Sequence, residues 1–259
     1  ISTVLVDEGL DGWGGLIFPP VDFRFSEPPK VLVTSPRDQI LRMAEALLKP
    51  EISVHESAQI EAALLRDSDL SSLVVSTGGL ATYPATIVGT MPIQETLRVA
   101  AHEWLHHYMY LRPLGWNIFS SPDMQILNET LADVAGREIG DRAYALLGLS
   151  LSDQVRSEGL ETPMSSESNA NDFDFQAELH EVRQRVETML ADARSSVNSQ
   201  TRLDKIKSAE TYMENRRNAF VEAGFNIRKL NQAYFAFHGT YGDQGASISP
   251  IGSQVHRFR

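Results

Sequence analysis

The feature that most restricts the fold of this chain is a helical pattern that begins near Pro92 and stops at Pro113 and Gly115. Proline is compatible with an early helical position, whereas proline and glycine together end a helix. A second helical pattern covers residues 124–147, and the Ser121-Pro122-Asp123 sequence before it is typical of a helix start. The chain therefore predicts two successive helices joined by a short loop.

The residues before these helices alternate between short β-like runs and helical patterns. The β-like runs are 21–25, 31–34, 73–77 and 83–88, and the helical patterns are 39–49 and 57–66. We expect the last two β-like runs to pair in one small sheet. Gly78-Gly79 between them is either a tight turn or a place where the backbone approaches a ligand.

The residues after the two helices divide into a polar stretch and a helical hairpin. Residues 150–172 are rich in Ser, Glu, Asp and Asn, which predicts a flexible linker or loop. Apolar residues at helical spacing over 173–223 predict the hairpin. Its first apolar stripe is Leu179, Val182, Val186, Met189 and Leu190. Such a stripe serves either helix packing or the docking of a partner.

The first of the two helices carries the motif H-E-x-x-H at residues 102–106. The spacing places the imidazoles of His102 and His106 on one face, one turn apart, where both can bind a single tetrahedral ion. Glu103 lies one position along, so its carboxylate can reach a water on that ion without binding the metal. The chain has no cysteine, so His and carboxylate must supply the ligands. The motif predicts a zinc site with Glu103 as general base.

A catalytic zinc needs a third protein ligand, and Glu129 on the second helix is the best candidate. Asp133 follows one turn later on the same face, where it can accept a hydrogen bond from the outer nitrogen of a zinc-bound histidine. His107 departs from the apolar residue that usually follows the second zinc histidine. It points away from the two-histidine face, and we assign it to a structural hydrogen bond.

With these residues the chain resembles the gluzincin zinc metallopeptidases, which have H-E-x-x-H on one helix and a glutamate ligand on the next. The resemblance implies bound Zn²⁺, peptide hydrolysis and a peptide or protein substrate. Four blocks also resemble an uncharacterised bacterial family of membrane-anchored metallopeptidases. They are G-G-L-A-T-Y-P at 78–84, H-E-W-L-H-H at 102–107, R-P-L-G-W at 112–116 and N-E-T-L-A-D-V-A-G at 128–136.

A second polar row lies near the C-terminus, where Asn231, Tyr234, His238 and Tyr241 are spaced three, four and three residues apart. On a helix they would form one face. Such a row can stabilise the oxyanion of a peptidase, and our order of preference is Tyr241, then His238, then Tyr234, with Asn231 in support. Alternatively, these residues are half-buried and satisfy one another.

This block, together with residues 214–217 before it, distantly resembles a segment of a bacterial aminopeptidase family. Arg216 and Arg217 would then neutralise a substrate carboxylate, or else form surface ion pairs.

Charge and hydropathy limit the partners. The formal net charge of -11 opposes binding to a phosphate backbone, so we expect no nucleic acid partner. No run approaches the roughly 20 apolar residues of a membrane-spanning helix. The family resemblance nevertheless implies that the chain is the soluble domain of a membrane-anchored bacterial protein, with its anchor outside these residues. The side of the membrane and the oligomeric state stay open.

Together these patterns predict a mostly helical α+β fold with a small sheet N-terminal to a zincin-like metal helix. Residues 1–149 would form an α/β lobe carrying the zinc site, 150–172 a linker, and 173–259 a helical lobe completing the cleft. The predicted function is zinc-dependent peptide hydrolysis by a zinc-bound water that Glu103 activates. The alternatives are a non-catalytic protein with a structural or relic zinc site and a partner-binding hairpin, or a metal-free helical scaffold.

Overall fold

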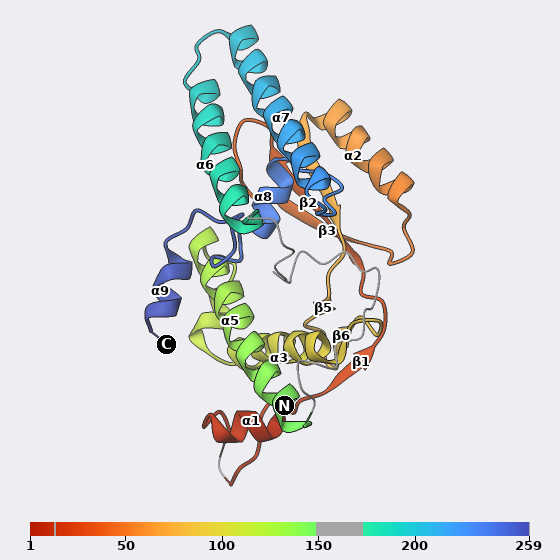
Figure 1. The fold of residues 1–259 in the computed structure, drawn as a ribbon, viewed down its shortest axis with the longest axis vertical. Coiled ribbons are helices and arrows are strands. Elements are labelled where there is room, and N and C mark those ends of the chain that lie inside the picture. The colour runs from red at the N-terminus through yellow and green to blue at the C-terminus, as the bar shows by residue number, and fades with distance from the viewer. Residues whose placement is uncertain (13, 149–172, 259) are drawn as a thin grey trace. The chain divides into compact units, whose positions relative to one another are not determined.

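The structure is a computed structural model that describes residues 1–12, 14–148 and 173–258 (Figure 1). Within these ranges it has nine helices and two three-stranded sheets, with 54% helix and 11% strand, which confirms a mostly helical α+β fold. The predicted linker at 150–172 lies outside the described residues. None of the described helices combines the length and apolar character needed to cross a bilayer.

The chain forms two compact units, each made of two segments. Unit 1 comprises Ile1–Pro28 and Thr77–Thr162, and unit 2 comprises Pro29–Ser76 and Pro163–Arg259. This division differs from the predicted lobe at 1–149. The second segment of unit 2 contains α8 (Gln232–His238), which packs against two strands from 29–76. Contacts between residues far apart in sequence therefore set the boundary.

Two helices dominate unit 1, and both begin and end close to where the sequence predicts. They are α3 (Ile93–Tyr110) and α5 (Pro122–Leu146), joined through the short α4 (Pro113–Trp116). The Ser121 side chain caps α5 by accepting a hydrogen bond from the Met124 backbone N–H. Apolar residues of α3, α5 and α1 (Ser2–Asp7) share one core. Its buried members on these helices include Val4, Leu5, Trp104, Leu105, Met109 and Ile139.

Two glycines on α5 let the backbones of α3 and α5 come close together. A Cβ on Gly136 would lie 2.9 Å from the Cα of His102, and a Cβ on Gly140 would lie 2.5 Å from the Cα of Arg98. Both distances are below normal contact, so larger residues would force the two helices apart. The pair therefore fixes how near α5 lies to the histidines of α3.

The small sheet of unit 1 has the order β1-β6-β5 and lies against α3. Its strands are β1 (Phe23–Phe25), β5 (Gly79–Leu80) and β6 (Ala85–Ile87). The central strand β6 pairs in parallel with β1 and antiparallel with β5. Gly79 is thus part of a strand and not of the predicted tight turn.

Unit 2 contains the other sheet, of order β3-β2-β4. Its strands are β2 (Lys30–Pro36), β3 (Ala44–Leu48) and β4 (Leu70–Val75). The predicted pairing of 73–77 with 83–88 is therefore wrong, because β4 pairs with β2 while β6 belongs to unit 1. The predicted helix at 39–49 is also wrong. Its Ala, Glu and Leu residues favour a helix, but antiparallel pairing with β2 overrides that local preference.

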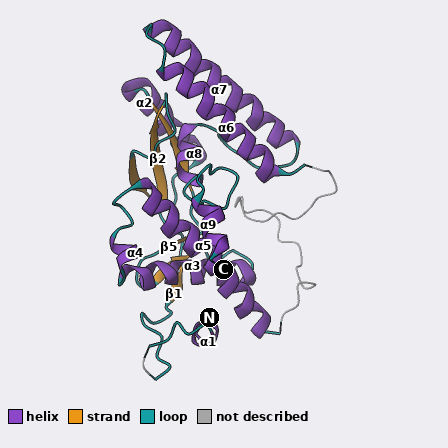
Figure 2. Cartoon of the chain, turned by 90° about the vertical axis from the view of Figure 1, so that its left-hand side faces the viewer, coloured by secondary structure: helices purple, strands orange, loops and turns teal. Residues whose placement is uncertain are grey.

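The predicted hairpin is confirmed as α6 (Phe175–Arg194) and α7 (Ser199–Glu222), which lie side by side in unit 2 (Figures 1 and 2). Unit 2 also contains α2 (Val54–Ser68) and α9 (Ile251–Arg257). The apolar stripe of α6 packs in the core together with residues of α7, β2 and α8. The buried stripe members are Leu179, Val182, Val186 and Leu190. Helix packing, and not an exposed docking face, accounts for this stripe.

Candidate metal centre

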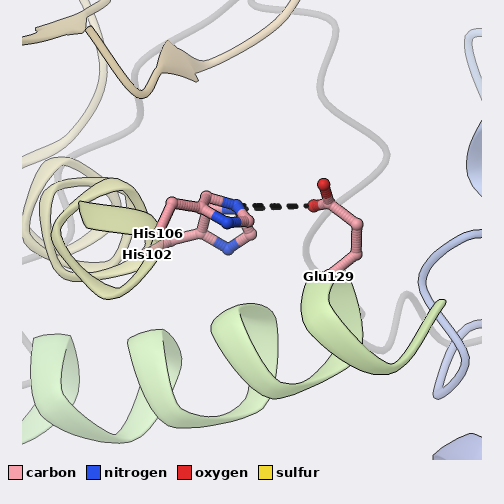
Figure 3. Close-up of side chains that lie close together, drawn as sticks. All are labelled: His102, His106 and Glu129. Atoms are coloured by element: carbon pink, nitrogen blue, oxygen red, sulfur yellow. Dashed lines mark hydrogen bonds and ion pairs between the residues drawn. The ribbon is translucent and has the colours of Figure 1, made fainter. Parts of the chain in front are cut away.

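The structure brings together the three side chains that the sequence predicts as metal ligands (Figure 3). His102 and His106 project from α3 and Glu129 projects from α5. The two Nε2 atoms are 3.0 Å apart, and Glu129 Oε2 lies 3.7 Å from His102 Nε2 and 3.6 Å from His106 Nε2. Three potential ligand atoms therefore point at one location.

These distances suit a tetrahedral zinc ion. Ligand atoms about 2.0–2.1 Å from such an ion lie about 3.3 Å from one another. The observed separations of 3.0, 3.6 and 3.7 Å bracket that value. Two imidazoles and one carboxylate are also a ligand set that zinc uses in catalytic sites, where the fourth position is left to water or substrate. Among the described residues, no fourth His, Asp or Glu joins the group.

Hydrogen bonds on the far side of each imidazole hold the rings in place. His106 Nδ1 donates to the side-chain oxygen of Asn128, at 3.0 Å. The His102 ring hydrogen-bonds to the backbone of Ala132. With Nδ1 of His106 protonated, its Nε2 can present a lone pair to a cation. No role for Asn128 was predicted, although it directly precedes Glu129 in the N-E-T-L-A-D block.

Burial and mutual charge make the two histidines differ before any metal binds. Burial, together with the charge of neighbouring His106, lowers the pKa of His102 to about 3, while the charge of Glu129 opposes this shift. Burial also disfavours the charged form of His106, but its hydrogen bond to Glu129 and the Glu129 charge outweigh this and raise its pKa to about 9. The group thus holds a proton that a divalent cation would have to displace.

Glu103 is buried beside the three ligands, with 7% of its surface exposed. Burial raises the pKa of Glu103 to about 7; the charge of His106 opposes this shift and that of Glu129 adds to it. Its carboxylate lies directly against β5, because a Cβ on Gly79 would come within 2.5 Å of Glu103 Oε1. Gly79 thus leaves room for the side chain of Glu103, a role that was not predicted from the sequence.

Two further residues near the site, Asp133 and His107, make contacts that the sequence did not predict. Asp133 is buried and forms an ion pair with Arg137 at 3.4 Å. The hydrogen bond from the outer nitrogen of His106 is accepted by Asn128. A contact of Asp133 with a zinc-bound histidine stays a prediction. His107 was predicted to form a structural hydrogen bond, but its Nε2 is buried with no hydrogen-bond partner within the described ranges. Its ring instead packs edge-on against Tyr83, with centroids 5.5 Å apart.

The predicted row near the C-terminus does not form one helical face. Asn231 caps α8 by accepting a hydrogen bond from the Tyr234 backbone, and it also donates to the Ser72 carbonyl. Because α8 ends at His238, Tyr241 lies beyond the helix. The rings of Tyr234 and His238 do pack together, with centroids 4.3 Å apart.

The surroundings of this row also limit its chemistry. Burial lowers the pKa of His238 to about 4, so this ring is neutral near pH 7 and does not supply a positive charge. Burial likewise raises the pKa of the Tyr234 hydroxyl. These residues belong to unit 2 and the metal ligands to unit 1. The oxyanion role of Tyr241, His238 or Tyr234 therefore stays a prediction.

Arg216 and Arg217, predicted to contact a substrate carboxylate or to form surface ion pairs, both form ion pairs. Arg216 pairs with Glu178, and Arg217 pairs with Glu214 at 2.7 Å. The surface ion-pair interpretation accounts for both.

Comparison of the chain with protein-family models, with curated proteins and with solved structures gave no match. The function must therefore be inferred from the residues of the site and their geometry.

Proposed function

We propose that this protein is a zinc-dependent peptidase of gluzincin type, in which His102, His106 and Glu129 hold the metal and Glu103 is the general base. The observation that carries the proposal is the convergence of these three ligand atoms, together with a buried carboxylate next to them that is not itself one of the three. This is the separation of ligand and base that the H-E-x-x-H motif requires.

Zinc, when bound, supplies a Lewis acid that polarises water and the substrate carbonyl. The chain's own part is to position groups and move a proton. The Glu103 carboxylate accepts a proton from the attacking water and delivers it to the leaving amine nitrogen as the C–N bond breaks. Asn128 fixes the orientation of the His106 ring throughout.

The substrate would lie along β5. Strand β6 has no free edge for this task, because it is flanked by β1 on one side and β5 on the other. Within the described residues β5 pairs only with β6, so its outer edge can accept an extended peptide by main-chain hydrogen bonds. Since Gly79 of this strand contacts Glu103, a peptide paired there would pass close to the base.

Two features support this proposal over a structural zinc site in a partner-binding protein. A structural site normally has four protein ligands, whereas three are found here in the described ranges. The hairpin that would bind the partner uses its apolar stripe in its own core. The anchoring of the native protein in a membrane, and an aminopeptidase specificity, remain secondary parts of the proposal.

The test is Glu103→Gln in the zinc-loaded protein. The amide keeps the size of the side chain but cannot accept the proton, so we expect peptide cleavage to fall by about 10²–10⁴-fold while one zinc per chain is retained. Undiminished cleavage of a quenched-fluorescence peptide library would refute the assignment of the base. Absence of cleavage by the native zinc-loaded chain across such a library would refute the peptidase itself.

A further inference from the structure

The connection between α3 and α5 exposes an unusual number of large apolar side chains. We call residues 110–119 the aromatic loop. Its exposed fractions are 70% for Tyr110, 46% for Leu111, 69% for Trp116 and 86% for Phe119. Single exposed apolar residues are common, but four within ten consecutive residues is a concentration that is typical of an interaction surface.

Several backbone carbonyls of the aromatic loop accept hydrogen bonds from within the loop. The Arg112 carbonyl accepts from the backbone N–H groups of Gly115 and Trp116, at 3.1 and 3.2 Å. The Pro113 carbonyl accepts from both the backbone and the side chain of Asn117, at 3.2 and 2.7 Å. Carbonyls that are already paired lose little when water is removed, which is the condition for entering an apolar medium.

The loop is also held so that its aromatic rings stay outside. A Cβ on Gly115 would lie 2.3 Å from the Met109 carbonyl oxygen, so α4 packs tightly on the end of α3. Leu114 packs against the core of unit 1, whereas Trp116 and Phe119 remain largely exposed. The exposure is therefore built into the turn.

The charge distribution favours a lipid surface as the partner. Between Glu103 and Asp123 the only Asp, Glu, Lys or Arg is Arg112, in a chain whose formal charge is -11. The Arg112 guanidinium lies over the Tyr108 ring, 3.3 Å from its centroid, and donates to the Tyr108 carbonyl. Self-association at this loop would bring together two chains that each carry a formal charge of -11, and their mutual repulsion disfavours it. A nearly uncharged patch of Trp, Tyr, Phe and Leu instead matches the headgroup boundary of a bilayer, where amphipathic rings are enriched.

We propose that the aromatic loop inserts Trp116 and Phe119 into the interface of a lipid bilayer, so that unit 1 rests on a membrane surface. The contact is shallow and does not span the membrane. The membrane contact requires neither the metal nor peptidase activity. Its test is therefore independent of the proposed function.

The experiment measures binding of the full chain to phosphatidylcholine vesicles by flotation, for the native protein and for Trp116→Ser/Phe119→Ser. Because a buried aromatic side chain removes about 150–250 Å² from water, we expect the double variant to bind at least about tenfold more weakly. Binding should change little with salt, since insertion is not electrostatic. Phe258→Ser is the matched control, because Phe258 is 94% exposed in unit 2, and it should bind as the native chain does.

Tryptophan fluorescence provides the second measurement. Vesicles with brominated acyl chains should quench the tryptophan fluorescence of the native protein. They should quench that of Trp116→Ser markedly less. The proposal is overturned if the native chain does not float with vesicles, or if the double variant binds equally well. It is also overturned if the variant changes only the oligomeric state, which would make a second copy the occupant. If the double variant loses cleavage of soluble peptides and the native chain does not bind vesicles, the loop would be assigned to substrate binding. That result would also overturn the membrane proposal.

Discussion

Helical periodicity predicts two rows of polar residues, the histidine pair of α3 and the row near the C-terminus. Only the histidine pair forms one face of a helix in the structure. On α3, His102 and His106 lie well inside a helix of 18 residues, and their rings converge. At the C-terminus, α8 has seven residues, so Asn231 becomes its cap and Tyr241 falls outside it. A spacing of three or four places residues on one face only where the helix extends beyond both of them.

The two rows also differ in what surrounds them. The α3 histidines meet a carboxylate from α5, and the close approach of the two helices depends on small residues such as Gly136. Tyr234 and His238 instead meet mainly aromatic and apolar neighbours, and burial holds the ring of His238 neutral. The first arrangement can bind a cation, and the second is that of a packed core.

The sharpest test of this contrast compares His106→Ala with His238→Ala. Removing one of three zinc ligands should weaken zinc binding by about a thousandfold, if the ligands share a binding free energy of about 10–16 kcal/mol. His238→Ala should leave zinc affinity unchanged. Competition with a chromophoric chelator measures both. Equal losses for the two variants would mean that the rows do not differ in the way described.

A glycine pair offers a second test, confined to unit 1. A Cβ on Gly79 would lie 2.5 Å from Glu103 Oε1 and 2.8 Å from a Val99 methyl, so Gly79→Ala must displace the base. We expect turnover to fall about 10²-fold, because a displacement of about 1 Å has that effect, while zinc affinity is retained. Gly78→Ala is the matched control, since its Cβ would meet nothing closer than 3.6 Å. Equal activity of the two variants would contradict the role given to Gly79.

Sequence alone identified the parts of the site that depend on local spacing. The motif at 102–106 and the start of α5 after Ser121 are both local, and both predictions match the structure. Glu129 was found because a third ligand is chemically required. Asn128 and Gly79 were missed as site residues, since their roles depend on which segments the fold brings beside α3.

The same difference between local spacing and long-range contacts explains which parts of the fold could be predicted. Helices with clear apolar periodicity, such as α6, could be predicted from the sequence. The strand β3 could not, because nothing within residues 44–48 favours a strand until β2 lies beside it. The assignment of residues 29–76 to unit 2 likewise depends on pairings that span more than a hundred residues, such as Asn231 with Ser72.

Asn128 and Asp133 test which residue supports the zinc histidines. Asn128→Ala removes the acceptor for His106 Nδ1, and loss of such a partner typically weakens metal binding 10–100-fold. Asn128→Asp keeps an oxygen acceptor and should keep the affinity. Asp133→Asn should have a smaller effect than Asn128→Ala, because the side chain of Asp133 pairs with Arg137. The reverse order, measured by the same chelator competition, would restore the role predicted for Asp133.

The smallest expected effect concerns stability and compares two helix caps of unit 2. Asn231 and Asn198 each accept a hydrogen bond at the start of a helix, but only Asn231 also donates to a buried carbonyl, that of Ser72. Asn198→Ala should therefore cost about 1 kcal/mol of unfolding free energy, and Asn231→Ala about 2 kcal/mol. Urea denaturation measures both, and zinc affinity should stay constant. A loss of zinc in Asn231→Ala with unchanged stability would instead place Asn231 in support of the metal site.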